Sequence, residues 1–276
     1  YPSRFFDVGI AEQHAVSMAA GMARGGYRPY FAVYSTFLQR AYDQIVHDVC
    51  LQNLPVCILS DHVGLVGDDG KTHHGVLSVP MLMSIPNLTL LAPRDTRQIR
   101  QAVRATLKLD GPCVDQYPKE GIEPYAQNVT GEPFAVGKWQ TLIPGGQDAV
   151  ILAYGRMTQN AIQASELLVR RGLSVGVIDC CSLKPLDMDC LRALFERKAK
   201  IVTIEEGEMI GGFGSEIARV CVEENADAPV QIIGLENRFI THGSVPELLR
   251  ECGLMPEQLA DRIEEIAGDK ESSHVG

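Results

Sequence analysis

The chain has 276 residues, enough for one large domain or two average domains with a substantial buried core. Its hydrophobic content of 45% is that of an ordinary globular protein, and its net charge of -10 argues against nucleic acid or an anionic membrane surface as the main partner. No apolar run reaches the ~18–20 residues of a membrane span, and no signal-peptide pattern opens the chain.

The first half of the chain alternates short apolar runs with amphipathic segments. Strands are predicted at residues 5–8, 30–34, 56–60, 88–92 and 113–116, and helices at residues 12–24, 36–52 and 93–108. The chain begins at Tyr1, without Met, and reaches the first strand at once. We therefore interpret it as a truncated or processed product whose upstream part is missing.

Pro, Gly, Glu and Asn dominate residues 117–133, as is typical of a linker. After it, strands are predicted at residues 148–153, 174–179, 200–205 and 230–235, and helices at residues 159–171, 189–197, 215–223 and 245–252. Repeated strand–helix units predict two doubly wound α/β domains, each a mostly parallel sheet with helices on both faces. We place the domains at residues 1–118 and 141–268, with a linker at 119–140 and a tail at 269–276.

Eight cysteines raise the question of disulfides or a metal site. Most lie inside apolar runs, such as residues 55–59, and none forms a CxxC pair. We therefore expect buried free thiols in a reducing cytoplasm, and hence a cytoplasmic protein.

An acidic residue, Glu12, lies just past the first predicted strand and opens the first predicted helix. This position is the carboxyl edge of a parallel sheet, where open α/β sheets bind ligands. The helix macrodipole alone favours a glutamate in a first turn, so the residue need not be functional. Gln13 and His14 add polar groups to a segment otherwise built for burial, which favours a functional site.

A second candidate site, residues 34–44, also spans a predicted strand-to-helix junction and offers a serine–threonine pair as the helix N-cap. The rings of Tyr34 and Phe37 could hold a flat heterocycle, and Arg40 follows on the same helix face. Taken by itself, Phe37 is better explained as the first core residue of the helix.

A third candidate is the glycine-rich loop at residues 64–75, which contains four glycines, two adjacent carboxylates and the adjacent imidazoles of His73 and His74. Asp and His are common metal ligands, but adjacent residues rarely bind one ion and a lysine separates the two pairs. A flexible loop that presents an imidazole for proton transfer fits the composition better, and an exposed turn is the remaining alternative.

In the second half, a glycine-rich turn at residues 211–215 leads into a predicted helix, where backbone N–H groups can bind phosphate. The GxGxxG spacing is absent, and Glu205 and Glu206 would repel an anion. We therefore expect these glycines to serve close backbone packing.

Together these segments resemble the transketolase-like family, and within it the 1-deoxy-D-xylulose-5-phosphate synthases. Residues 6–16 (FDVGIAEQHAV) look like the glutamate motif of the family, and residues 34–44 (YSTFLQRAYDQ) are very specific to the synthases. The glycine-rich loop resembles their substrate loop, and residues 205–215 and 239–243 resemble their C-terminal domain. The resemblance covers nearly the whole chain and implies a pyrimidine-binding domain followed by the C-terminal domain.

The resemblance implies a thiamine diphosphate enzyme that condenses pyruvate with glyceraldehyde 3-phosphate, with loss of CO₂, for the synthesis of isoprenoid, thiamine and pyridoxal precursors. In the family, the glutamate that matches Glu12 hydrogen-bonds the aminopyrimidine ring of the cofactor and favours the tautomer that activates it. By the same resemblance, the aromatic rings of Tyr34 and Phe37 would line the pyrimidine pocket. Three polar residues would face the substrates: Arg40, Asp69 and His73. His73 would be a proton donor or acceptor, and hence a catalytic residue beside Glu12.

Two departures from the family pattern concern the acceptor. The family has DRAG where residues 61–64 read DHVG, and RYPRG where residues 116–120 read QYPKE. His62 and Lys119 therefore replace the arginines that would hold the phosphate of the acceptor. Lysine binds phosphate as a point charge without the planar fork of arginine, and histidine is only partly charged near neutral pH. We expect weaker binding of the sugar phosphate, or a different acceptor.

The resemblance places the diphosphate and Mg²⁺ site on a domain absent from these residues, which contain no GDG…N metal motif. We therefore expect the isolated chain to be inactive, and to form a homodimer or to pair with a chain or segment that carries this domain. Two alternatives stay open: a β-type subunit of another thiamine-dependent transketolase or 2-oxoacid dehydrogenase, and an inactive fragment or pseudoenzyme. The synthase-specific motif favours the synthase over the first alternative.

Overall fold

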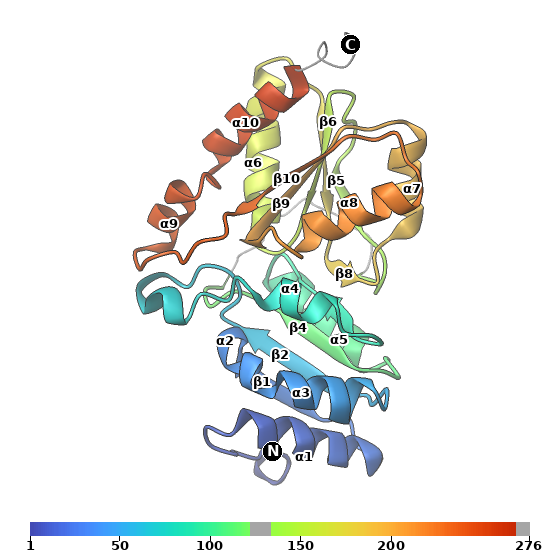
Figure 1. Ribbon diagram of the computed structural model, residues 1–276, viewed down its shortest axis with the longest axis vertical. Coiled ribbons are helices and arrows are strands. Elements are labelled where there is room, and N and C mark those ends of the chain that lie inside the picture. Colours follow the sequence, from blue (N-terminus) through green and yellow to red (C-terminus); the bar gives the residue numbers. More distant parts are fainter. Residues whose placement is uncertain (122–133, 269–276) are drawn as a thin grey trace.

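The computed structural model describes residues 1–121 and 134–268, which form two α/β domains stacked along the long axis of the molecule (Figure 1). Each domain contains a five-stranded, mostly parallel sheet with helices on both faces. The predicted fold class, two doubly wound α/β domains, is therefore confirmed. Among the described residues, none of the helices is both long and apolar enough to span a membrane.

The first sheet is parallel except at one edge. Its strands are, in spatial order, β1 (Tyr30–Tyr34), β2 (Cys57–Asp61), β4 (Cys113–Gln116), β3 (Thr89–Leu91) and β8 (Ser182–Lys184). The first three pairings are parallel, whereas β8 runs antiparallel to β3. Ile58, Leu90 and Val114 project from neighbouring strands into the core and are at most 1% exposed.

Helices and turns surround this sheet. They are η1 (Pro2–Arg4), α1 (Glu12–Arg24), α2 (Ser35–Leu38), η2 (Gln39–Ala41), α3 (Tyr42–Gln44), η3 (Ile45–Cys50), η4 (Gly67–Thr72), α4 (Ser78–Met83) and α5 (Thr96–Thr106). On α1, small apolar side chains at Ala15, Ala19 and Ala23 form a buried stripe at helical spacing. The Asp95 side chain caps α5 by accepting the N–H of Gln98 at 2.8 Å.

The second sheet has the strand order β10 (Val230–Leu235), β9 (Ile201–Glu208), β6 (Ala149–Ala153), β7 (Val175–Asp179) and β5 (Gln140–Ile143). Only β5 is antiparallel to its neighbour. Every residue of β6, β7 and β9 is buried, because helices cover both faces of the sheet. The helices are α6 (Met157–Arg170), α7 (Met188–Glu196), α8 (Phe213–Glu223), α9 (Val245–Glu251) and α10 (Pro256–Gly268).

Several details differ from the sequence-based predictions. The strand predicted at residues 5–8 is wrong, because this segment is irregular and Phe5 is 76% exposed. A strand needs a neighbour to complete its ladder of hydrogen bonds, and among the described residues no strand lies beside this segment. The helix predicted at residues 36–52 is divided into short α, 3₁₀ and π-helical pieces. The helices α4 and α10 and the antiparallel strands β5 and β8 were not predicted.

A buried polar network lies at the junction of the two domains. Arg94, which follows β3, donates to the carboxylate of Asp179 at the end of β7 and to Oε1 of Gln140, the latter at 2.8 Å. Gln98 of α5 donates to the same carboxylate at 2.7 Å. Asp179 is completely buried, and burial raises its pKa while the Arg94 guanidinium opposes this rise. Together with β8, which crosses into the first sheet, this network links the domains.

A second buried carboxylate, that of Asp115, has no hydrogen-bond partner. Asp115 of β4 is completely buried, and neither of its carboxylate oxygens has a hydrogen-bond partner. Burial raises its pKa to about 8. The folded chain therefore keeps a proton that the unfolded chain loses near pH ~4. The contribution of the protonated Asp115 carboxyl to the stability of the fold is therefore complete below pH ~4. It is lost as the pH rises through about 8.

Asp115→Asn is expected to remove this pH dependence, because the amide is neutral at every pH. Stability of the wild type should fall between pH 5 and pH 8 by up to about 1.4 kcal/mol per pH unit from this group alone. The stability of the variant relative to that of the wild type should therefore increase from pH 5 to pH 8 and change little above pH 8, as measured by urea unfolding. Asp110→Asn, at an exposed position, is the matched control. An unchanged slope in Asp115→Asn would contradict the assignment.

Candidate active site

The predicted site residues gather at the carboxyl edge of the first sheet. Tyr34 ends β1, His62 follows β2 and Lys119 lies three residues beyond β4. Because the carboxyl ends of parallel strands meet at one edge, segments far apart in the chain come together there. Glu12, the first residue of α1, joins them through its contact with Arg40.

Glu12 is a buried carboxylate with one ion-pair partner. Its residue is 6% exposed, and Nη1 of Arg40 donates to its Oε1 at 3.1 Å. The Arg40 side chain remains 54% exposed, and its guanidinium carbon lies 5.2 Å from the centroid of the Phe37 ring. Arg40, which was predicted to face the substrates, therefore also neutralises the buried carboxylate.

Three rings form a stack beside this ion pair. Tyr34 lies between Phe37 and His62, with ring centroids 5.2 Å and 3.7 Å away and interplanar angles of 17° and 19°. His73 approaches Phe37 edge-on, with its centroid at 5.5 Å. Phe37 is half-buried and belongs to neither hydrophobic core cluster, so the alternative that it is a core residue is not supported. The stack leaves Tyr34 37% exposed.

The two remaining predicted residues, Asp69 and Lys119, form an ion pair at 2.5 Å. The Lys119 ammonium lowers the pKa of Asp69, and the charges of His73 and His62 act in the same direction. Asp69 in turn raises the pKa of Lys119. Both side chains are partly exposed, so the pair can be opened by a competing anion at little cost. Six of the eight predicted site residues are thus joined by direct contacts, and Asp69 and Lys119 form a separate pair that is linked to the histidines only electrostatically.

The two histidines of the glycine-rich loop have different surroundings. His73 contacts Phe37, whereas His74 is buried and uses both ring nitrogens in hydrogen bonds to the backbone. Within residues 1–121 and 134–268, no group of three or more His, Cys, Asp or Glu side chains could hold a metal ion. The metal-site alternative for this loop therefore has no support in the described residues.

Backbone N–H groups of the glycine-rich turn in the second domain bind a carboxylate of the same domain, that of Glu205. Glu205 accepts the N–H groups of Phe213 and Gly214, at 3.0 Å and 2.9 Å, at the start of α8. A Cβ atom at Gly212 would lie 2.5 Å from the same carboxylate. The predicted packing role is confirmed, since these N–H groups are already occupied. Burial raises the pKa of Glu205 to about 7.

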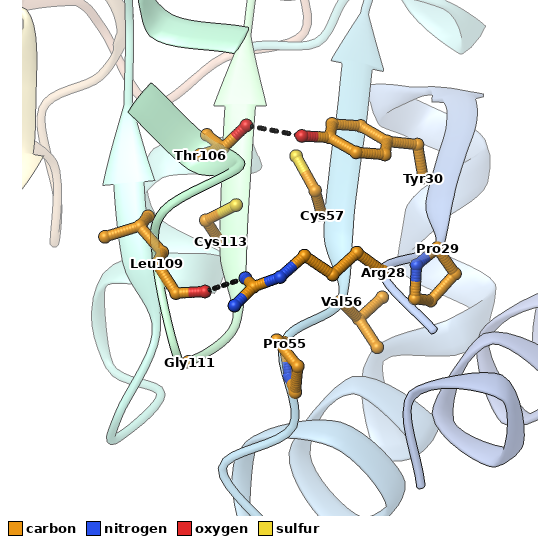
Figure 2. A pocket seen from close by; sticks show the side chains of 10 residues that line it. All are labelled: Arg28, Pro29, Tyr30, Pro55, Val56, Cys57, Thr106, Leu109, Gly111 and Cys113. Carbon is orange, nitrogen blue, oxygen red and sulfur yellow. Dashed lines mark hydrogen bonds between the residues drawn. The ribbon is translucent and has the colours of Figure 1, made fainter. Parts of the chain in front are cut away.

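A separate small pocket lies at the opposite, amino-terminal edge of the first sheet (Figure 2). Its lining includes the first residues of three strands, Tyr30, Cys57 and Cys113, and Tyr30 shares a hydrogen bond of 3.0 Å with Thr106. The predicted free thiols are confirmed, because all eight cysteines are unpaired. None of the predicted site residues lines this pocket.

Comparison with known proteins matches both halves of the chain. Residues 1–123 match the model of the transketolase pyrimidine-binding domain, and residues 137–259 match that of the transketolase C-terminal domain. The 1-deoxy-D-xylulose-5-phosphate synthase of Geobacillus thermodenitrificans is 44% identical over 98% of this chain, and that of Listeria innocua is 43% identical over 98%. The chain spans about 43% of the length of these relatives.

Among solved structures, a split-gene transketolase, described as an inactive β₄ tetramer, has a TM-score of 0.85 and 30% identity. The match covers 96% of this chain and 84% of that one. The chain belongs to the transketolase family. The transketolase of Campylobacter jejuni, with a TM-score of 0.79 and 18% identity over 94% of this chain and 39% of that one, shares the fold.

Members of the transketolase family use thiamine diphosphate together with a divalent metal ion such as Mg²⁺. The described residues fit one end of this cofactor. The buried carboxylate of Glu12 has the chemistry to hydrogen-bond a pyrimidine nitrogen, and the partly exposed rings of Tyr34 and Phe37 lie close by. For the metal end, the described residues contain no group of three or more His, Cys, Asp or Glu side chains that could hold a metal ion.

Two residues of this transketolase-like site were not among the predicted site residues. Glu206 and His74 hold the glycine-rich loop against the second domain. In the sequence, Glu206 is part of a segment that resembles the C-terminal domain of the family and a charge that would repel an anion, and His74 is one of an adjacent histidine pair. No periodicity or spacing could have connected them, because the Leu65–Glu206 contact joins residues 141 positions apart.

Proposed function

We propose that the chain forms the pyrimidine-binding and C-terminal part of a 1-deoxy-D-xylulose-5-phosphate synthase. This enzyme condenses pyruvate with glyceraldehyde 3-phosphate and releases CO₂, for the synthesis of isoprenoid and thiamine precursors. The observation that carries the proposal is the buried Glu12 carboxylate, which lies beside half-exposed aromatic rings at the carboxyl edge of a parallel sheet. Identities of 43–44% to synthases over 98% of the chain support it.

In this proposal Glu12 hydrogen-bonds the aminopyrimidine of the cofactor and shares a proton with its ring nitrogen. Its burial suits the task, because a shielded carboxylate is not solvated in competition with the ring. Tyr34 and Phe37 line the pocket with apolar ring surface. Arg40 keeps the Glu12 carboxylate in place. When bound, thiamine diphosphate supplies the electron sink that loss of CO₂ from a 2-oxo acid requires.

The loop residues act on the substrates. His73, whose imidazole touches the edge of Phe37, is the proton donor or acceptor for the substrate oxygen atoms. Asp69 and Lys119 receive the acceptor, and a phosphate that reaches Lys119 must displace the Asp69 carboxylate or share the ammonium with it. His62 lies against Tyr34 at the same edge, where its imidazole can donate a hydrogen bond to the acceptor.

The diphosphate and Mg²⁺ are held by a further segment or a second chain in this proposal. The likeness to a split-gene transketolase, of which this chain covers 84%, supports a two-chain or dimeric assembly. The large exposed side chains of Phe5, Phe6 and Ile10, which precede Glu12, are suited to such a contact. The eight free thiols support a cytoplasmic location.

The same likeness favours a second candidate, the corresponding subunit of a split transketolase. An assay of the assembled enzyme distinguishes the synthase from the transketolase. The chain is co-expressed with the diphosphate-binding part, and CO₂ release from pyruvate is measured with and without glyceraldehyde 3-phosphate. The synthase requires both substrates for full turnover. Transfer from a ketose phosphate without CO₂ release would establish the transketolase instead. Failure of every combination to bind thiamine diphosphate would exclude both.

Lys119→Ala is expected to raise the KM for glyceraldehyde 3-phosphate by about tenfold or more, because a charge-assisted hydrogen bond contributes about 1.5–3 kcal/mol. The kcat should change less, and the KM for pyruvate should stay constant. Steady-state kinetics of the assembled enzyme provide the measurement. Lys108→Ala, at an exposed position on the opposite edge of the domain, is the control. An unchanged acceptor KM in Lys119→Ala rejects the phosphate role.

A further inference from the structure

The glycine-rich loop (residues 64–75) follows the first sheet, yet it is held by the second domain. The Glu206 carboxylate, near the end of β9, accepts the N–H of Leu65 at 2.8 Å. Glu206 is buried, and Nη1 of Arg156 lies 3.3 Å from the same oxygen, Oε1. The loop is thereby fixed at its start by a buried, charge-compensated acceptor.

The backbone at this point has no room for another residue type. Gly64 has a φ of +77°, a conformation that favours glycine. A Cβ atom at Gly64 would lie 2.7 Å from the carboxyl carbon of Glu206. The loop therefore approaches the carboxylate too closely for a side chain to fit between them.

His74 fixes the other end of the loop. Its Nδ1 accepts the N–H of Val66 at 3.1 Å, so the proton of the neutral imidazole is on Nε2. Nε2–H then donates to the carbonyl oxygen of Thr241 at 2.8 Å, in the second domain. The imidazole thus bridges two segments of backbone that are far apart in the chain, and the two bonds together select one tautomer.

The middle of the loop lies against the same segment of the second domain. A Cβ atom at Gly70, where φ is +69°, would lie 3.2 Å from Cβ of His242. A Cβ atom at Gly67 would lie 3.4 Å from the carbonyl oxygen of Gly243. Asp69 and His73 are thus carried by a loop that approaches the second domain at its start, in its middle and near its end.

From these contacts we infer that Glu206 and His74 are positioning residues, which fix the loop onto the second domain and so hold Asp69 and His73 at the edge of the first sheet. Neither residue contacts Tyr34, Phe37 or Glu12 through any hydrogen bond of the described structure, so both act through the loop backbone. A displacement of about 1 Å at a reacting group can lower a rate by about 100-fold. The kinetic consequence rests on the proposed function, whereas the fixation of the loop does not.

Amide hydrogen exchange of the 276-residue chain tests the fixation directly. His74→Leu removes both hydrogen bonds, and exchange across residues 64–75 should become at least tenfold faster. His74→Gln retains one acceptor and one donor on its carboxamide, so most of the protection should return. Circular dichroism and the melting temperature show whether each variant folds. Unchanged exchange in a folded His74→Leu variant would overturn the positioning role.

Substitutions at two glycines, Gly64 and Gly26, provide a second test that does not depend on His74. Gly64→Ala pushes a methyl group against the Glu206 carboxylate and should accelerate exchange at Leu65 and Val66. Gly26→Ala imposes the same kind of backbone strain, at a φ of +87°, where nothing lies within 4 Å. If both variants accelerate loop exchange equally, the effect is general strain and the role of Glu206 is rejected.

Kinetics of the assembled enzyme connect the loop to catalysis. His74→Leu should lower kcat/KM for the acceptor by about 10–100-fold, with His74→Gln close to the wild type. Faster exchange with unchanged kcat/KM would overturn the catalytic consequence. If the wild-type assembly lacks synthase activity, only the proposed function fails, because the exchange measurement decides the positioning role independently.

Discussion

Glu12→Ala is expected to lower pyruvate-dependent CO₂ release by the assembled enzyme about 10²–10⁴-fold, the range that a positioned acid–base group contributes. The buried carboxylate is the only acidic group that the described structure places in the first turn of α1, where it pairs with Arg40. Its loss leaves Arg40 without a partner, but Arg40 is half-exposed and can be solvated, so the fold should survive. Full activity in Glu12→Ala would refute the assigned mechanism.

Glu12→Gln refines this experiment. The carboxamide keeps a hydrogen bond but cannot exchange a proton with the ring nitrogen, so activity should stay low while thiamine diphosphate still binds. Binding by calorimetry and turnover are therefore measured on the same preparation. Glu196→Ala, at an exposed position of α7, is the control for the loss of an acidic side chain. If Glu12→Gln is as active as the wild type, Glu12 only holds the cofactor in place.

Arg94→Met is expected to lower the free energy of unfolding by about 3–5 kcal/mol, because it leaves the carboxylate of Asp179 buried without its counter-ion. Asp179 is completely buried, and its pKa is already raised by burial. Without Arg94 the pKa should rise further, so the loss should be greater at pH 9 than at pH 5. Urea unfolding at both pH values measures the effect.

Two variants complete the comparison. Arg94→Met combined with Asp179→Asn removes both charges and keeps an acceptor for Gln98, so part of the stability should return. Arg192→Met disrupts an ion pair with Glu224 at the surface, and its unfolding midpoint should match that of the wild type. A small effect of Arg94→Met at both pH values would show that the network contributes little to the junction of the domains.

The order of strands and helices could be predicted from the chain because it is encoded locally. Apolar runs of four to six residues are typical of strands buried on both faces, and β6 and β7 lie where such runs occur. The exceptions have a physical reason. Residues 5–8 have the composition of a strand but no neighbour among the described strands, and β8 is a three-residue strand whose partner, β3, is in the other domain.

Most candidate residues of the site could likewise be found from motifs around Glu12, Tyr34 and His73, because these motifs are continuous in the chain. The residues that pair with them could not be predicted from the sequence. Arg40 pairs with Glu12 across 28 positions, and Lys119 pairs with Asp69 across 50. Such contacts depend on which strands are neighbours in the sheet, and local periodicity carries no information about that order.

The sequence by itself therefore determined the α/β class, the two-domain organisation and the motifs that carry the candidate site residues. Only the tertiary structure decided how their charges are compensated and what holds the loop that carries Asp69 and His73. The reason is that Glu206 and His74 act through backbone groups of distant segments, and any residue type presents the same N–H and C=O groups.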